Sequence, residues 1–486
     1  MAKAVTKSHN SGPVADTGQV VQSDHSVQSA QVGRSRAFGS AARGRKPVGH
    51  AAIVAAVAGL MALSACTERE ILLSGPREDL HAVTGDTAAQ EAPPVNRAEP
   101  ISLPAISANA DWTQGAGSPA TRTSNAALGA NAQEIWAVSV GEGETRKSEI
   151  TADPVVAAGR VFAMDAGASV TAVTPGGQTL WSRDLTPVQD RAGEASGGGL
   201  AYANGRLFVA SGYGMLTALD PASGAVLWQQ KLGASATGAP SAYGDLVYVT
   251  AGEEEGWAIN QSDGRVQWQT SATPDINNLS GAPSPAVNDQ YVIFGFGSGE
   301  LRAAFRRGGL GIWAAPISGR REGFARSNIS DITGDPVISG NTVFAGNQSG
   351  RMVALQLANG ERLWTADEGP MNPVWPAGNS VFLLSDENKL IRLSASSGER
   401  IWAVDLPFFT GTKPKKQEQV YAHYGPILAG GRLVTASSDG LVRFFDPVSG
   451  ALTRSLPIEG GAASAPVVAG GILYVVSRDG VLHAYR

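Results

Sequence analysis

Reactive side chains are scarce in this chain of 486 residues. It contains one cysteine, Cys66, and six histidines, of which His423 and His483 are the two beyond residue 130. A single cysteine excludes a disulfide framework and every metal site built from clustered cysteines. Two histidines are also too few for a catalytic zinc site that uses three of them as ligands. The composition therefore argues against a disulfide scaffold, a cysteine-cluster metal site and a three-histidine zinc enzyme.

Patterns typical of other active sites are no stronger. His483 lies in an ordinary apolar stretch, so nothing around it indicates Ser–His–Asp catalysis. Asp439-Gly440 and Asp479-Gly480 resemble fragments of Ca²⁺-binding loops, but Asp-Gly pairs are typical of tight β-hairpin turns. The Gly-rich stretch 295–299 is not followed by the helix that a phosphate-binding loop needs. We therefore predict no catalytic residue, no metal site and no cofactor.

The segment before Cys66 indicates what this cysteine does. Basic residues within 43–46 precede an apolar run over 51–63, which is too short to span a bilayer but suits a signal peptide. The run ends in Leu-Ser-Ala-Cys at 63–66, which resembles the lipobox of bacterial lipoproteins. That resemblance implies that Cys66 is acylated and becomes the mature N-terminus. In that family the residue after the cysteine decides where the lipoprotein is sorted. Thr67 at this position, instead of Asp, resembles lipoproteins that are sorted to the outer membrane. The alternative is a plain secretory signal with an incidental cysteine.

The sequence divides into a leader, a tether and a repetitive region. Residues 1–65 comprise a polar extension, predicted to be disordered, and the signal peptide. Residues 66–128 are rich in Ala, Pro, Ser and Asn, and we expect a lipid-anchored flexible tether. Within the tether, 71–73 and 111–114 stand out as apolar or aromatic pieces that are candidates for docking on the fold. The folded domain is expected to cover 129–486.

Tryptophan recurs about every 44 residues through this domain. Each unit contains short apolar runs separated by Gly turns, the pattern of a four-stranded propeller blade. A single blade cannot bury both of its faces, so blades must stack. The units predict an all-β, eight-bladed β-propeller in which the tryptophans are structural and fill the gaps between blades. They are Trp136, Trp181, Trp228, Trp268, Trp313, Trp364 and Trp402.

The two ends of the repeat region are incomplete in a complementary way. The last unit stops at Arg486 after three strands, whereas the extended stretch 134–138 precedes the first complete unit. We expect 134–138 to supply the missing outer strand, which closes the ring and hides the edges of the broken blade. The seventh unit ends at 451–456 without a tryptophan.

The repeat, clearest over 214–228, resembles that of the quinoprotein alcohol dehydrogenase-like propellers. Together with the lipobox and the tether, it resembles in particular the BamB family of outer-membrane lipoproteins. The resemblance implies a non-catalytic scaffold of the β-barrel assembly (BAM) complex at the periplasmic face of the outer membrane. Its expected partners are the POTRA domains of BamA, other BAM subunits and unfolded outer-membrane protein precursors.

The resemblance also suggests partner-binding residues in two loops. Leu279 and Gly281 match the family's first loop motif, with Ser280 where the family has Arg. Asp331 matches the second motif, although its second Asp is missing in this chain. Arg326, a few residues upstream, is a candidate for the missing positive charge. These residues form the predicted BamA-binding site.

Two other functions stay open. A dehydrogenase using pyrroloquinoline quinone would, by resemblance to that family, need adjacent cysteines and a Ca²⁺ site, and Cys66 stands alone. A periplasmic propeller with an unrelated partner is the other alternative. A net charge of −5 is too small for a nucleic-acid-binding protein. The basic loop 405–424 is interpreted either as a solvated loop or as a contact for a partner or lipid headgroups, and the arginines over 302–321 as a candidate partner surface.

Overall fold

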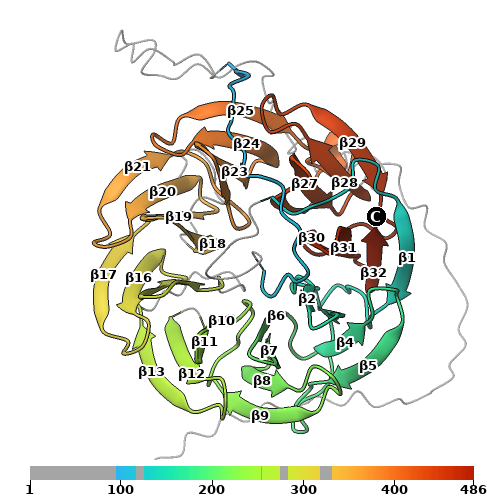
Figure 1. Cartoon of the computed structure of the whole chain (residues 1–486), viewed down its shortest axis with the longest axis vertical. Coiled ribbons are helices and arrows are strands. Elements are labelled where there is room, and N and C mark those ends of the chain that lie inside the picture. The colour runs from blue at the N-terminus through green and yellow to red at the C-terminus, as the bar shows by residue number, and fades with distance from the viewer. Residues whose placement is uncertain (1–94, 116–124, 253, 274–282, 318–330) are drawn as a thin grey trace, which may run out of the picture. The chain divides into compact units, whose positions relative to one another are not determined.

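The computed structural model describes residues 95–115, 125–252, 254–273, 283–317 and 331–486. Eight four-stranded antiparallel sheets form a closed ring around a central axis (Figure 1). The predicted all-β, eight-bladed propeller is therefore confirmed. No helix within the described ranges is long and apolar enough to cross a membrane.

Each blade runs from an inner first strand to an outer fourth strand (Figure 1). Blade 1 contains β2 (Val155–Ala157), β3 (Arg160–Met164), β4 (Ser169–Val173) and β5 (Thr179–Asp184). Blade 2 contains β6 (Gly198–Ala203), β7 (Arg206–Ser211), β8 (Met215–Leu219) and β9 (Val226–Lys231). Blade 3 contains β10 (Ser241–Tyr243), β11 (Leu246–Ala251), β12 (Glu255–Asn260) and β13 (Val266–Ser271). Blade 4 contains β14 (Ala286–Val287), β15 (Tyr291–Gly295), β16 (Glu300–Phe305) and β17 (Gly311–Pro316).

The second half of the ring repeats this plan. Blade 5 contains β18 (Ile332–Ser339), β19 (Thr342–Asn347), β20 (Arg351–Gln356) and β21 (Arg362–Ala366). Blade 6 contains β22 (Trp375–Ala377), β23 (Ser380–Leu384), β24 (Lys389–Ser394) and β25 (Arg400–Asp405). Blade 7 contains β26 (His423–Ala429), β27 (Arg432–Ser437), β28 (Leu441–Phe445) and β29 (Leu452–Pro457), after the short 3₁₀ helix η2 (Pro414–Lys416). Blade 8 contains β30 (Val467–Ala469), β31 (Ile472–Val476), β32 (Val481–Tyr485) and β1 (Glu134–Ser139).

Burial follows the position of a strand within its blade. The second strand of blade 2, β7, is almost entirely buried, because neighbouring blades cover both of its faces. Its outer strand, β9, alternates between exposed and half-buried residues, as expected for a strand with one solvated face. The apolar runs of the sequence therefore correspond to the inner strands, whose side chains pack between neighbouring blades to form the core.

The repeated tryptophans join adjacent blades through the same contact. Each indole Nε1–H donates a hydrogen bond of 2.8–3.3 Å to a carbonyl in the turn between the third and fourth strands of the next blade. A glycine in that turn lies against the indole ring. Gly224, for example, has φ of 69°, and a Cβ there would lie 2.6 Å from the ring of Trp181. The turn therefore requires glycine for both its backbone conformation and its closeness to the ring.

The ring closes between the two ends of the repeat region. β1 pairs antiparallel with β32, so the N-terminal strand is the outer strand of the blade that contains the C-terminus. The backbones of Gln133 and Arg486 exchange two hydrogen bonds of 2.8 Å. In blade 7, Arg454 stands at the position that holds tryptophan in the other blades. The next blade has no turn between its third and fourth strands, because these are β32 and β1 from the two ends of the repeat region. Its guanidinium donates to the carbonyls of Ala130 and Ala132.

Residues 95–115, here called the strap, cross the ring from blade 6 to blade 3. Asn96 exchanges hydrogen bonds with the backbone of Ala403, and the side chain of Gln114 does so with the backbone of Ala242. The interpretation of 66–128 as a flexible tether is therefore wrong for the strap. Composition suggested flexibility, but the strap gains order from backbone hydrogen bonds to inner-strand edges, which composition does not reveal.

Trp112 is the anchor of the strap. Its side chain is fully buried and stacks on Trp375, with ring centroids 6.1 Å apart. Its backbone N–H and C=O pair with Val156 of β2 at 2.7 and 2.8 Å. The candidate docking piece 111–114 therefore does dock, whereas 71–73 lies outside the described residues.

Candidate partner-binding face

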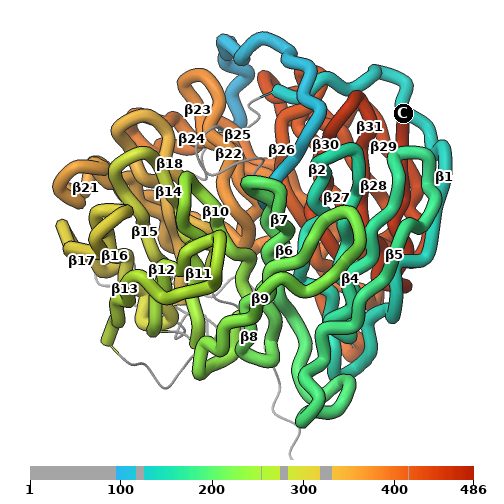
Figure 2. Tube along the Cα trace, turned by 60° about the horizontal axis from the view of Figure 1, so that its bottom comes forward, coloured from blue at the N-terminus to red at the C-terminus, as the bar shows by residue number. Residues whose placement is uncertain are grey.

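The two faces of the ring carry different chain segments. One face bears the turns between the first and second strands of each blade, and the strap lies on it (Figure 2). We call this the hairpin face. The other bears the segments that connect each outer strand to the next blade, and we call it the connection face. Both predicted partner-binding loops belong to connections, the first between β13 and β14 and the second between β17 and β18.

A cavity of about 330 Å³ lies on the axis and is lined by residues of the connection face. Gly115, the last described residue of the strap, also lines it. The strap therefore contributes to the hairpin-face side of this cavity. Four carboxylates line it, those of Glu144, Glu149, Asp153 and Asp335.

Asp153 and Asp335 hold equivalent positions on opposite sides of the ring. Each precedes a proline at the inner strand of its blade, and each accepts a hydrogen bond from a backbone N–H of the preceding blade. The donors are Ala465, at 2.7 Å from Asp153, and Ser284, at 2.8 Å from Asp335. Burial raises the pKa of Asp153 to about 7; the negative charge of Asp335 adds to this, and the Ala465 N–H opposes it. The cavity therefore favours protonated or cation-paired carboxylates.

The cavity does not fit a quinone cofactor with three carboxylates. Its described lining includes no Lys, Arg or His that could neutralise such an anion. Within the described ranges, no group of three or more His, Cys, Asp or Glu is arranged to hold a metal ion either. The chemistry of the cavity therefore disfavours the dehydrogenase alternative, and we derive no reaction from it.

The predicted partner-binding residues are only partly described. Leu279, Ser280, Gly281, Arg326 and the lipidation site Cys66 lie outside the described residues. Asp331 directly precedes β18 and is 4 % exposed. A carboxylate with so little accessible surface does not present its charge to a partner in this conformation. The prediction that Asp331 contacts a partner directly is therefore not supported by this conformation.

Two of the arginines over 302–321, Arg302 and Arg306, are engaged in contacts within the fold. Arg306 is buried, lies over the ring of Tyr243 at 5.0 Å and donates to the carbonyl of Asp289. Arg302 forms an ion pair with Glu300 at 2.6 Å. Both side chains therefore serve the fold of blade 4 and its neighbour, and the interpretation of these two as partner contacts is wrong. Arg307 is exposed and stays a candidate partner contact, whereas Arg320 and Arg321 lie outside the described residues.

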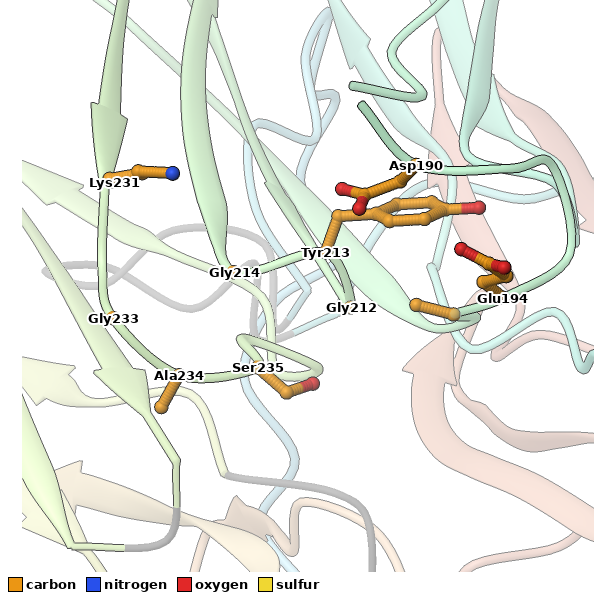
Figure 3. A pocket seen from close by; sticks show the side chains of 10 residues that line it. Asp190, Glu194, Gly212, Tyr213, Gly214, Lys231, Gly233, Ala234 and Ser235 are labelled. Carbon is orange, nitrogen blue, oxygen red and sulfur yellow. The ribbon is translucent and has the colours of Figure 1, made fainter. Parts of the chain in front are cut away.

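A second hollow of the connection face, of about 480 Å³, lies where blades 1 and 2 meet their connections. Figure 3 shows Tyr213 beside Asp190 and Glu194 on one side and Lys231 on the other. The Tyr213 hydroxyl donates to the carbonyl of Arg191 at 2.9 Å, so it fixes the local connection. With both charge signs on its walls, this hollow has no clear preference for an anion or a cation.

Asp153 and Asp335 are not among the candidate site residues predicted from the sequence, although a repeated dipeptide marks both of them. Asp-Pro occurs at 153–154 and again at 335–336, at the same place in the first and fifth units. His423 and His483 are both buried and belong to structural hydrogen bonds: His423 bonds to Ser437 and His483 to Glu134. Neither histidine lines the axial cavity.

Comparisons with known proteins place the chain within this architecture. A family model described as outer membrane protein assembly factor BamB matches residues 166–404 and 412–486. The protein of that name from Yersinia pestis is 24 % identical over 361 residues, covering 72 % of this chain and 88 % of the relative. The one from Shewanella oneidensis is 26 % identical over 357 residues, covering 71 % and 87 %.

Solved structures agree on the fold. BamB from Moraxella catarrhalis matches with a TM-score of 0.60 at 17 % identity, covering 73 % of this chain and all of that one. Quinohemoprotein alcohol dehydrogenase from Comamonas testosteroni matches with a TM-score of 0.58 at 13 % identity, covering 77 % and 80 %. Likeness at this level of identity defines the architecture alone, and enzymes and assembly factors share it.

The closed ring of eight blades, joined by tryptophans at one repeated position, defines an eight-bladed propeller with quinoprotein-like repeats. Within that class, the family model covers more than half of the sequence. The chain belongs to the family of outer membrane protein assembly factor BamB.

Proposed function

We propose that this protein is a non-catalytic scaffold subunit of the outer-membrane β-barrel assembly complex. In this role it binds the POTRA region of BamA and supports the folding and insertion of outer-membrane proteins. Family membership supports the assembly role, because the curated relatives carry the name of an assembly factor. Other BAM subunits and unfolded precursors are further proposed partners.

The observation that carries the choice of surface is the asymmetry of the two faces. The strap occupies the hairpin face, where its backbone already pairs with inner-strand edges such as Val156. The connection face carries the axial cavity and both predicted loops. We therefore propose that BamA binds the connection face through Leu279, Ser280, Gly281 and Arg326.

The location proposed for the protein is the periplasmic face of the outer membrane. Acylation of Cys66 would supply the anchor, since multiple acyl chains hold a protein on a membrane where one chain does not. Mass spectrometry of the mature N-terminal peptide tests this. A diacylglyceryl modification with N-acylation on Cys66 is the expected result, and an unmodified cysteine would contradict it.

The partner site is tested by measuring the binding of the purified protein to the cognate BamA POTRA fragment. Leu279→Arg places a charge in a loop proposed to make apolar contact, and we expect affinity to fall about tenfold or more. Leu363→Arg is the matched control, because it makes the same Leu-to-Arg change at a half-exposed position of the outer strand β21, outside the connections. Equal binding by both variants would refute the site, and no binding by the wild type would refute the partner.

A further inference from the structure

The 405–424 loop, which connects β25 to β26, is a structured hairpin on the connection face. Phe409 and Val420 form an antiparallel bridge across its stem. The amide of Thr410 donates to the carbonyl of Gln419 at 3.0 Å, and that of Tyr421 to Phe408 at 2.8 Å. The helix η2 lies within its tip. The stem is therefore a regular hairpin, and most of the loop's residues are exposed to solvent.

Two side chains fix the base of this hairpin to blades 6 and 7. His423 bonds through one ring nitrogen to the Ser437 hydroxyl at 2.6 Å and through the other to the Pro407 carbonyl at 2.9 Å. The Asn388 amide donates to the carbonyls of Pro407 and Tyr421 at 3.1 and 2.9 Å. A stem held at both ends loses little conformational entropy when a ligand binds to it.

A mainly apolar pocket of about 300 Å³ lies beside the stem. Met371, Leu384, Phe408 and Val420 contribute its apolar walls. Three large apolar side chains near it are exposed to solvent, Met371 by 42 %, Phe409 by 41 % and Val420 by 54 %. Single exposed apolar residues are normal on protein surfaces, but a cluster around a concavity is typical of a binding site.

The tip of the hairpin carries positive charge. Lys413, Lys415 and Lys416 are exposed, and within the described part of the chain none of them forms an ion pair. The chain as a whole has a net charge of −5, and the axial cavity nearby is lined by carboxylates. The lysines favour acidic residues in a ligand at the tip. The pocket itself, which includes the carboxyl of Asp386 and adjoins the carboxylate-lined cavity, favours an uncharged apolar side chain.

We propose that the 405–424 hairpin is a docking site for an acidic protein segment with one aromatic or aliphatic side chain that enters the pocket. Its apolar residues lie at the stem and around a concavity, whereas the tip is polar. A membrane surface would meet the polar tip before any apolar side chain, so this arrangement fits a protein segment better than a bilayer.

The site is continuous with the face proposed for BamA. Met371, Asn372 and Tyr424 line both the pocket and the axial cavity. The inference rests on the proposed function in one respect, namely that the segment belongs to a member of the assembly complex on this face. The recognition chemistry itself depends only on the pocket and the lysines.

A fluorescent peptide with one Phe among Glu residues is the probe, used with the full mature protein. Fluorescence anisotropy should report binding that weakens as salt concentration rises. Peptides with Phe replaced by Ser, or with Glu replaced by Gln, should each bind at least about tenfold more weakly. Vesicles containing phosphatidylglycerol form the competing arm. Binding of the vesicles without binding of the peptide would overturn the proposal in favour of a lipid contact.

Variants locate the site. Val420→Ser, at a pocket-lining position that is 54 % exposed, should weaken peptide binding about tenfold or more, whereas Leu363→Ser, at a position of β21 that is 53 % exposed, should leave it unchanged. Equal affinity of both variants would refute the pocket. The same variants should be tested on the POTRA fragment. If that fragment fails to bind even the wild type while the peptide binds in a way that depends on Val420, the proposed function fails and the docking site stands.

Discussion

Asp153 makes the stability of the folded propeller depend on pH. Its carboxyl lies in the axial cavity, and burial raises its pKa to about 7. The folded protein therefore binds this proton more tightly than the unfolded chain, in which the pKa is near 3.9. Stability from this group is fully present below about pH 4 and is lost as the pH rises towards 7.

Asp153→Asn removes this dependence and retains an oxygen that can accept from Ala465. We expect the variant to be more stable than the wild type at pH 8 by about 1–2 kcal/mol and to gain little at pH 4. Chemical denaturation at the two pH values measures the difference. Asp405→Asn, at an exposed carboxylate, is the control and should show no such change. An identical pH profile for Asp153→Asn and the wild type would contradict the prediction.

The strap is the element whose contacts the sequence least revealed. Trp112 stands out by residue type, but its partners Val156 and Trp375 are distant in sequence. Regular strands were easier to predict, because their Gly turns and apolar runs repeat in every unit. The tryptophan positions follow from the same repetition. Hydrogen bonds such as that of Gln114 with Ala242 occur once, so no periodic pattern reveals them.

Trp112→Ala should undock the strap. Loss of a fully buried tryptophan costs about 3–5 kcal/mol when its site cannot collapse. We expect faster hydrogen exchange at the Val156 amide, which donates to Trp112, and unchanged protection in β7. Ile106→Ala is the matched control, because Ile106 belongs to the same strap and is 57 % exposed. Unchanged exchange at Val156 would show that the strap stays docked without the indole.

At the scale of the whole molecule, the boundary between blades 7 and 8, here called the seam, is the one place in the described ring where the tryptophan contact between adjacent blades cannot form. A tryptophan contact needs a continuous turn in the next blade, and the seam instead presents two separate chain segments. The absence of tryptophan from 451–456 is visible in the sequence, but its replacement by the contacts of Arg454 is not. The candidate site has the same limit, since its loops are the least repetitive parts of the chain.

Arg454→Ala should loosen this seam. The variant loses charge-assisted hydrogen bonds to the carbonyls of Ala130 and Ala132, which together contribute about 2–3 kcal/mol. We expect a lower unfolding midpoint and faster exchange at the amides of Gln133 and Arg486. Arg265→Ala, which removes an exposed ion pair with Asp263, should change stability by less than about 0.5 kcal/mol. Equal effects of the two substitutions would rule out a special role for Arg454.

The pairing of β1 with β32 also has a consequence in time. Glu134 and His483, whose side chains hydrogen-bond across this pair, are 349 positions apart, so a ribosome makes one long before the other. Until the last strand emerges, β1 has no partner and the eighth blade presents an open edge that attracts other chains. Closure of the ring therefore waits until β32 has been made. A chain that loses its final strand is left with a permanently open edge, a defect that proteases or chaperones can detect.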